Sequence, residues 1–383
     1  MNAKMIAVIA VAVLAVAGVG TAIVLTQQPA EKKGLYKLDA TVIDDIDMGG
    51  MSGTPKMVET LEHMYESVYG ELTDTAKAKT LDDAKADETF WNTYCKFTSI
   101  ASKSGDVVTY KTVVDDKTTK FTEKNFTGKA TKIIGTGSAY PYAAYIMLCQ
   151  KYSVKPWSSE AKAKTEITNE FQSLIYGGLV KSSVADSSKD LEAMLPSTYV
   201  EACKSIGSYE TEKMAADVKA AINGGAETVF LMGSGTIAKT SNATFVTTVE
   251  NEGGHILLNN AKGIPDTLAM IEQIGIILGF DSSVVDGVIQ DFQLRMYKIY
   301  VSAQEKNAAN PDKTYKAYFE GSSGKASSAT SNGAALSKFF GWDTTLFDGA
   351  EHDLENLLTE KPNILMFYSN DDRTMDEKMR ATS

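Results

Sequence analysis

The spacing of apolar positions changes along the chain, and each spacing predicts a kind of element. Before residue 106 the apolar side chains recur every three or four residues, which is typical of one helix face. One such face consists of Met57, Leu61, Met64, Tyr65 and Val68. A second face is aromatic and consists of Phe90, Trp91, Tyr94 and Phe97, which we interpret as core. Residues 34–105 are therefore predicted to form a mainly helical extension.

From residue 106 the pattern becomes a strand pattern and then an alternation of strands and helices. Val108, Tyr110, Thr112 and Val114 alternate with other residues, which predicts a strand pair over 106–121. Short apolar runs predict further strands at 131–134, 227–232, 245–249, 255–258, 315–319 and 364–368. Helical spacing predicts helices at 141–152, 266–278, 282–305, 333–340 and 353–360. The helix over 282–305 would span about 36 Å.

The N-terminal segment Met5–Thr26 is an uncharged apolar run. As a helix it would reach about 33 Å, enough to cross a hydrocarbon core of about 30 Å. It predicts a membrane anchor over residues 5–26, within a 1–33 segment that ends in a tether. A cleaved signal peptide is the alternative, although the Ala-x-Ala patterns at 10–12 and 15–17 lie inside the run rather than after it. Either interpretation places the body of the chain outside the cytoplasm.

Length and charge limit the class of protein. The chain has 383 residues, which suits two lobes better than one core. Its composition is that of a globular protein, with 43% apolar residues. The net charge of −11 argues against a broad nucleic-acid-binding face, so nucleic acid is not expected as a partner.

The three cysteines form neither a CxxC pair nor a metal-ligand spacing. Cys149 lies in an apolar run and is interpreted as a small buried hydrophobic residue. A bridge between Cys95 and Cys203 is left open by the sequence.

Motifs for cofactors or catalysis are incomplete. The turn Gly135–Tyr140 lacks the third glycine of a dinucleotide fingerprint. Gly324-Lys325 lacks the earlier glycine of a phosphate loop and is followed by Ala326 where Ser or Thr would hold magnesium. His63, His255 and His352 are isolated from one another in sequence. We therefore expect no cofactor, no metal site and no enzymatic activity.

Small polar loops follow three of the predicted strands, at Gly135–Tyr140, Gly233–Thr236 and Gly321–Ser323. In open α/β sheets, ligands bind beyond the carboxyl ends of the strands. We predict that one ligand-binding groove is lined by Ser138, Tyr140, Ser234, Ser323 and Trp342. The alternatives are ordinary strand-to-helix turns, and for Trp342 a place in the core.

Three segments carry a resemblance to a known family. The stretch Asp353–Leu365 reads D-L-E, a short helix, K-P-N and an apolar strand, and Val113–Ile134 reads as a hairpin followed by a strand. Thr267–Gln304 forms a predicted helix pair containing Gly275 and Gly279. In this order, over about residues 106–370, the chain resembles the class III periplasmic substrate-binding proteins of ABC importers (helical-backbone, cobalamin/siderophore/metal type). Asn363 stands where the family usually has Asp.

The resemblance implies an α/β fold with two Rossmann-like lobes joined by a long helix, preceded by the N-terminal membrane helix and the helical extension. The expected division is a first lobe over 106–265, connecting helices over 266–307, and a second lobe over 308–383 that is incomplete against the family. The implied function is delivery of a small ligand (a metal chelate, corrinoid, haem or metal ion) to an ABC permease.

The resemblance also implies that Glu355 docks on permease arginines, in a stretch made acidic by Glu351 and Asp353. A solvated helix face is the alternative for Glu355. The alternative function is a membrane-anchored surface interaction protein without a transport role. The unexplained extension favours it, as do two N-x-[ST] sequons at Asn125 and Asn242. A metallohydrolase is disfavoured because His and Asp residues do not cluster.

Overall fold

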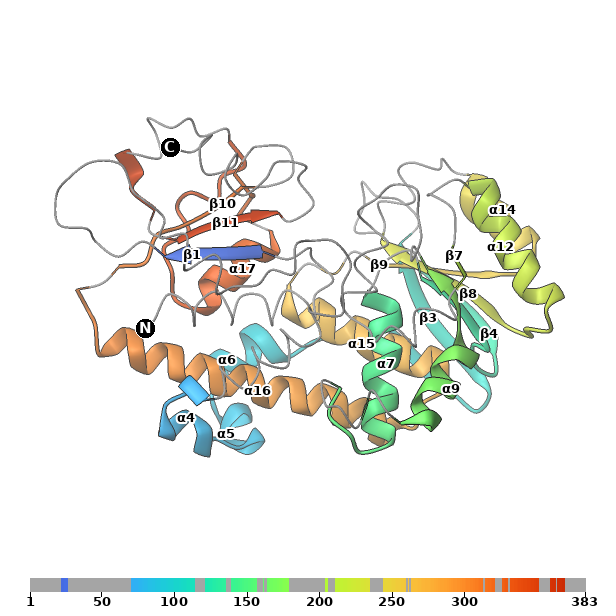
Figure 1. Ribbon diagram of the computed structural model, residues 1–383, viewed down its shortest axis with the longest axis horizontal. Coiled ribbons are helices and arrows are strands. Elements are labelled where there is room, and N and C mark those ends of the chain that lie inside the picture. The colour runs from blue at the N-terminus through green and yellow to red at the C-terminus, as the bar shows by residue number, and fades with distance from the viewer. Residues whose placement is uncertain are drawn as a thin grey trace.

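The computed structural model describes the chain in ranges: 22–26, 70–113, 121–135, 139–156, 161, 164–178, 204–205, 211–234, 244–259, 261, 263–312, 314–320, 326–329, 331–350, 359–362 and 364–368. Two groups of strands and helices lie side by side above one long helix (Figure 1). We call the group around the larger sheet the first lobe, and the group around β10 and β11 the second lobe.

A five-stranded parallel sheet forms the centre of the first lobe, in the order β7-β6-β5-β8-β9. Its strands are β5 Lys132–Gly135, β6 Ile175–Gly178, β7 Lys204–Ser205, β8 Val229–Ser234 and β9 His255–Asn259. Successive side chains point to opposite faces, and both faces are apolar. One face carries Ile133, Phe230, Met232 and Leu257, and the other carries Ile134, Leu231, Ile256 and Leu258. The strands predicted at 131–134, 227–232 and 255–258 are confirmed.

Helices cover both faces of this sheet, as parallel strands require. On one face lie α7 Ala139–Lys151 and α9 Thr165–Leu174, which contribute Tyr145, Leu148, Ile167 and Phe171 to the core. On the other face lie α12 Thr211–Asn223 and α14 Thr244–Asn251 (Figure 1). The first lobe is therefore a three-layer α/β/α unit.

The prediction of a strand at 245–249 is wrong, because these residues belong to α14. The run Thr-Phe-Val-Thr-Thr-Val is rich in β-branched residues, which favoured a strand. Val246 and Val249 are three residues apart and both pack against the core that contains Val218 of α12. Because a helix places both valines on the face that packs against this core, packing favours a helix over a strand here.

An antiparallel sheet lies beside the parallel one and consists of β2 Ala101–Ser104, β3 Val107–Val113 and β4 Phe121–Thr127. The predicted alternation is confirmed for Val108, Tyr110 and Thr112, which are buried on one side of β3. Val114 lies outside the described residues. Strand β2 falls in the segment predicted to be mainly helical, and it pairs with β3 from Ala101 to Ser104.

Two helices connect the lobes. Helix α15, Ile264–Leu278, ends at Gly279 in the left-handed conformation, with φ of 73°. Helix α16, Ser282–Ala308, has 27 residues and spans about 40 Å. It runs beneath both lobes in Figure 1. Its buried side chains include Val285, Ile289 and Met296, and it confirms the helix predicted over 282–305.

The second lobe contains β10 Ala317–Glu320, helix α17 Asn332–Phe339 and β11 Ile364–Tyr368, with β10 and β11 parallel. Strand β1, Ala22–Thr26, pairs antiparallel with β11. The sequence had placed these five residues at the end of a membrane helix, so the structure differs there. Ile, Val and Thr have a high strand propensity, and the backbone of β11 provides a strand with which this segment pairs. Residues 5–21 lie outside the described part, in which no helix is long and apolar enough to cross a bilayer.

The described part of the extension is mainly helical up to Cys95, and only then continues into β2. It consists of α4 Asp74–Ala78, α5 Leu81–Ala86, α6 Glu88–Phe90 and the π-helical turn η1 Trp91–Cys95. Phe90 is fully buried, and Trp91, Tyr94 and Phe97 pack against the same core, which confirms the aromatic side chains as core residues. The helix predicted from Met57 to Val68 lies outside the described residues.

Candidate functional site

Small and polar residues end the strands of the parallel sheet. Strands β5, β6, β8 and β9 end at Gly135, Gly178, Ser234 and Asn259. Gly135 pairs with Gly178, and Ser234 pairs with Asn259, so these ends lie along one edge. Small residues let a ligand approach the backbone, and the carboxyl edge of a parallel sheet is where α/β folds bind ligands. We call this row of strand ends the carboxyl edge.

Tyr140 connects the carboxyl edge to helix α7. It lies in the first turn of α7 and is 5% exposed. Its hydroxyl donates a hydrogen bond to the carbonyl of Gly233, at the end of β8. Burial raises the pKa of Tyr140, and a hydrogen bond with the Asn259 backbone opposes that effect in part. The phenol is therefore neutral at physiological pH and ties α7 to the ends of β8 and β9.

A buried amide pair holds the end of β9 from the other side. Asn259 Nδ2 donates to Gln273 Oε1 of α15 over 3.4 Å, a long hydrogen bond. Gln273 Nε2 in turn donates to the carbonyls of Ile100, at 3.2 Å, and Lys111, at 2.7 Å. The end of β9 is thus connected to α15 and to the antiparallel sheet. A buried network of this kind fixes the position of the edge.

Sequence reasoning missed Asn259 and Gln273. A polar residue after the apolar strand His255–Leu258 was one available signal. The other was a glutamine within the apolar face of the helix predicted over 266–278. Buried polar side chains need partners, so such positions suggest a network even when the partner is unknown.

Trp342 of the second lobe lies in the core. It is 4% exposed and stacks on Phe340, with ring centroids 4.9 Å apart and an interplanar angle of 27°. Its indole N–H has no hydrogen-bond partner among the residues that the structure describes. The structure thus favours the core interpretation of Trp342, while its role in a groove stays a prediction.

The other predicted site residues are only partly covered by the structure. The backbone of Ser234 closes β8, and its side chain lies outside the description. Ser138, Ser323 and the docking candidate Glu355 lie outside the described residues, as do Glu351 and Asp353. The structure therefore brings Tyr140 and the ends of β5, β8 and β9 together, and the shared groove between the lobes stays a prediction.

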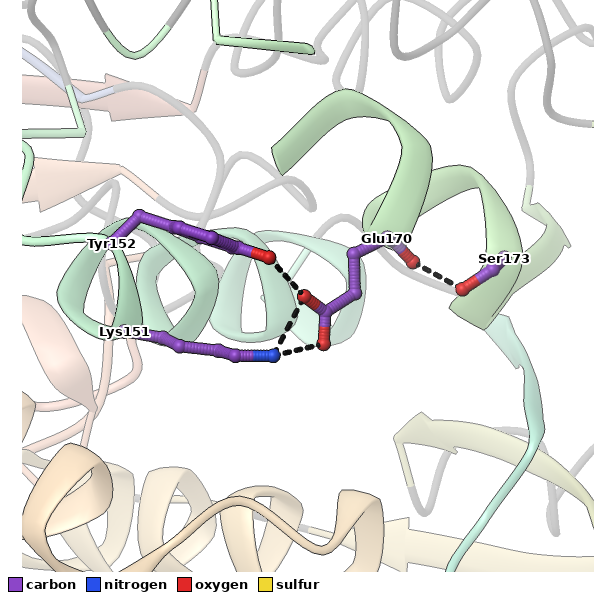
Figure 2. A network of polar contacts seen from close by, with 4 residues as sticks. All are labelled: Lys151, Tyr152, Glu170 and Ser173. Atoms are coloured by element: carbon purple, nitrogen blue, oxygen red, sulfur yellow. Dashed lines mark hydrogen bonds and ion pairs between the residues drawn. The ribbon is translucent and has the colours of Figure 1, made fainter. Parts of the chain in front are cut away.

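A second polar network, at the other end of α7, braces α9 (Figure 2). Lys151 Nζ lies 2.7 and 2.8 Å from the two carboxylate oxygens of Glu170, and the Tyr152 hydroxyl donates to the same carboxylate over 2.9 Å. The hydrogen bond to Glu170 raises the pKa of Lys151. The lysine side chain is 42% exposed, and the network fixes α9 against α7.

The potential metal ligands of the described ranges do not form a cluster. No group of three or more His, Cys, Asp or Glu side chains there is placed to hold a metal ion. His255 stacks on Phe230, with ring centroids 4.9 Å apart. Within the described residues Cys95 and Cys149 are buried free thiols, which confirms Cys149 as a buried residue. Cys203, the bridge partner that the sequence left open for Cys95, lies outside them.

Comparisons with known proteins gave likenesses to solved structures alone. No protein-family model matches the chain, and no curated protein matches it. A periplasmic binding protein from Veillonella parvula DSM 2008 is similar over 70% of this chain and 74% of that chain, with 12% identity and a TM-score of 0.44. The iron uptake ABC transporter substrate-binding protein PiuA from Streptococcus pneumoniae Canada MDR_19A is similar over 70% and 77%, with 16% identity and a TM-score of 0.39.

Proposed function

We propose that this chain is an extracytoplasmic solute-binding protein that delivers a small ligand to an ABC importer. The observation that carries the proposal is α16, a single helix of 27 residues that joins a parallel α/β lobe to a second lobe with parallel strands β10 and β11. This architecture agrees with the family that the sequence resembles. The ligand class implied by that resemblance is a metal chelate, a corrinoid, haem or a metal ion.

The carboxyl edge of the first lobe supports a binding role. Its strands end in small or polar residues, and Tyr140, Asn259 and Gln273 hold the edge in place through buried hydrogen bonds. A rigid, preorganised edge lowers the entropy cost of binding. In the proposal, the loop after β5 contributes Ser138, the last residue of β8 is Ser234, and the loop after β10 contributes Ser323 from the other lobe.

The continuity of α16 bears on how such a site would close. A long helix bends far less than an irregular linker, so the lobes would move by small angles around a bound ligand.

The test is a search for the ligand itself. Purified full-length chain is denatured, and the released small molecules are identified by mass spectrometry together with elemental analysis for metals. Ferric chelates, haem and cobalamin are then added to ligand-free protein in thermal unfolding. A true ligand at 100 times its Kd should stabilise the fold by about 2.7 kcal/mol. No released ligand and no stabilisation by this panel, with stable binding to another surface protein, would favour the interaction-protein alternative.

We also propose that the segment Met5–Thr26 takes the chain out of the cytoplasm. A residue cannot lie in a bilayer span and in the β1–β11 pair at once, so the location of Ala22–Thr26 distinguishes the two arrangements. Carbonate washing of membranes and sequencing of the mature N-terminus test this. Full-length chain that resists washing supports the anchor, whereas a shortened chain in the medium supports a cleaved signal. Full-length chain in the cytoplasm contradicts export.

A further inference from the structure

Residues 70–104, which we call the strap, form a second connection between the lobes beside α16. The strap begins at the end of α16 that leads into the second lobe. There the Thr73 N–H donates to Ser302 Oγ over 3.2 Å, and the Thr73 hydroxyl donates to the Glu305 carboxylate. Lys306 Nζ donates to the carbonyl of Glu71 over 2.6 Å. One end of the strap is therefore fixed to the last two turns of α16.

The middle of the strap contacts both α16 and the second lobe. Phe90 is fully buried, with its ring centroid 4.8 Å from Tyr297 and 5.0 Å from Tyr300 of α16. The Tyr94 ring lies edge-on to Phe339 of α17, with centroids 5.1 Å apart. Aromatic pairs of this geometry contribute beyond the area that they bury. The strap thus holds α17 against α16.

The far end of the strap becomes part of the first lobe. Gln293 Nε2 of α16 donates to the carbonyl of Cys95 over 3.2 Å. Gln273 Nε2 of α15 donates to the carbonyl of Ile100 over 3.2 Å. The chain then enters β2, which pairs with β3 from Ala101 onward. In Figure 1 the short helices of the strap lie along α16.

We propose that the strap fixes the angle between the two lobes and restrains their hinge motion. A lobe joined by one helix bends and twists where that helix ends. A second, parallel connection that packs on the same helix and on both lobes opposes both motions, because bending must then break the aromatic contacts of Phe90 and Tyr94. This inference concerns the protein alone and does not depend on the identity of its ligand.

The experiment measures the distance between the lobes in the ligand-free full-length chain. Spin labels are placed at two exposed positions, Ala220 of α12 and Lys338 of α17, through Ala220→Cys and Lys338→Cys, with Cys203→Ser to remove that thiol. The distance distribution is recorded by double electron–electron resonance. Tyr94→Ala removes the contact with α17. Tyr152→Ala is the matched control, since Tyr152 is also a partly buried tyrosine but lies on the α7–α9 brace.

We expect Tyr94→Ala to raise hydrogen exchange over residues 70–97 and to widen the distance distribution by about a factor of two, with the control unchanged. If Tyr94→Ala leaves exchange unchanged, Phe90→Ala is the stronger perturbation. Raised exchange with an unchanged distribution overturns the proposal, as does equal widening in the Tyr152 control. Unchanged hydrogen exchange in both Tyr94→Ala and Phe90→Ala also overturns the proposal, because the aromatic contacts would then not stabilise the strap.

Discussion

The hydroxyl of Tyr140 donates to the carbonyl of Gly233, a residue 93 positions later in the chain. This hydrogen bond joins the first turn of α7 to the end of β8. Because both groups are buried, neither is exposed to bulk water that would replace a lost partner. The contact therefore stabilises the fold and positions the carboxyl edge at the same time.

We expect Tyr140→Phe to lower the free energy of unfolding by about 1–3 kcal/mol, because it leaves the Gly233 carbonyl buried without this donor. The matched control is Tyr152→Phe, which removes a hydroxyl from a partly exposed carboxylate and should cost less than about 1 kcal/mol. Urea unfolding of both variants measures the difference. Equal losses of unfolding free energy in the two variants would mean that the buried Tyr140 hydrogen bond stabilises the fold no more than the partly exposed one of Tyr152.

The crossing of α15 and α16 depends on Gly275. A Cβ at this position would lie 2.6 Å from Val285 Cγ2 and 3.2 Å from the methyl group of Met147. Gly275→Ala should therefore destabilise the fold by about 1–3 kcal/mol despite the better helix propensity of alanine. Gly287→Ala is the control, since its Cβ would meet the flexible amide of Gln150, 2.5 Å away. We expect its effect on the urea midpoint to be small. A larger loss for Gly287→Ala than for Gly275→Ala would contradict this account.

The sequence predicted an element well where the spacing of apolar residues within that element determines its conformation. The helix predicted over 282–305 is observed as Ser282–Ala308. The three residues beyond the predicted end, 306–308, show no repeat of apolar side chains that could have predicted them. Contacts with residues distant in the sequence support them, such as the hydrogen bond from Lys306 to the Glu71 carbonyl. The prediction failed at 245–249, where β-branched residues favoured a strand and packing on α12 favoured a helix.

The sequence predicted residues of the candidate site only where a recognisable loop motif lies next to them. Tyr140 was found because a glycine-containing turn precedes it. Asn259 and Gln273 were missed because their hydrogen bond joins two elements, and no local spacing encodes such a pair. The contacts of the strap could not be predicted from the sequence either. The aromatic spacing predicted that Phe90 is buried, but not that α16 and α17 bury it.

Glu355 is the residue for which the resemblance predicts a role in docking. A carboxylate that binds permease arginines acts in transport and not in ligand binding. We expect Glu355→Ala to keep the Kd for the ligand and to reduce uptake in a reconstituted importer, more so with Asp353→Ala. An exposed carboxylate outside an interface should be replaceable at under about 0.5 kcal/mol. Unchanged uptake in the double variant would remove the docking role.

Cys95 and Cys149 should resist alkylation in the folded protein. Burial raises the pKa of each thiol to about 12, so the reactive thiolate is scarce at neutral pH. Both side chains are also inaccessible, at 1% and 0% exposure. Iodoacetamide labelling at about pH 8, read by peptide mass spectrometry, should modify these two residues only after unfolding. Rapid labelling of either one in the native protein would show that its surroundings open.

His255 should make the fold less stable in mild acid. Burial lowers its pKa below the ordinary value of 6.5; the Glu250 carboxylate opposes this shift, and Lys124 adds to it. The imidazole stacks on Phe230, where a proton is poorly solvated. As the pH falls through about 6.5, the unfolded chain takes up a proton that the folded chain does not yet bind. The free energy of unfolding therefore decreases below this pH, and the contribution of His255 is fully present above it.

The variant His255→Gln separates this effect from that of other titrating groups. Glutamine carries no charge at any pH, so the difference between the wild-type chain and the variant isolates the imidazole. Urea unfolding between about pH 8 and about pH 5 should show a steeper loss of stability in the wild-type chain. Parallel pH profiles would mean that His255 binds its proton equally well in the folded and unfolded states. In that case the ring stack on Phe230 would contribute no pH dependence, and the acid sensitivity would arise from carboxylates.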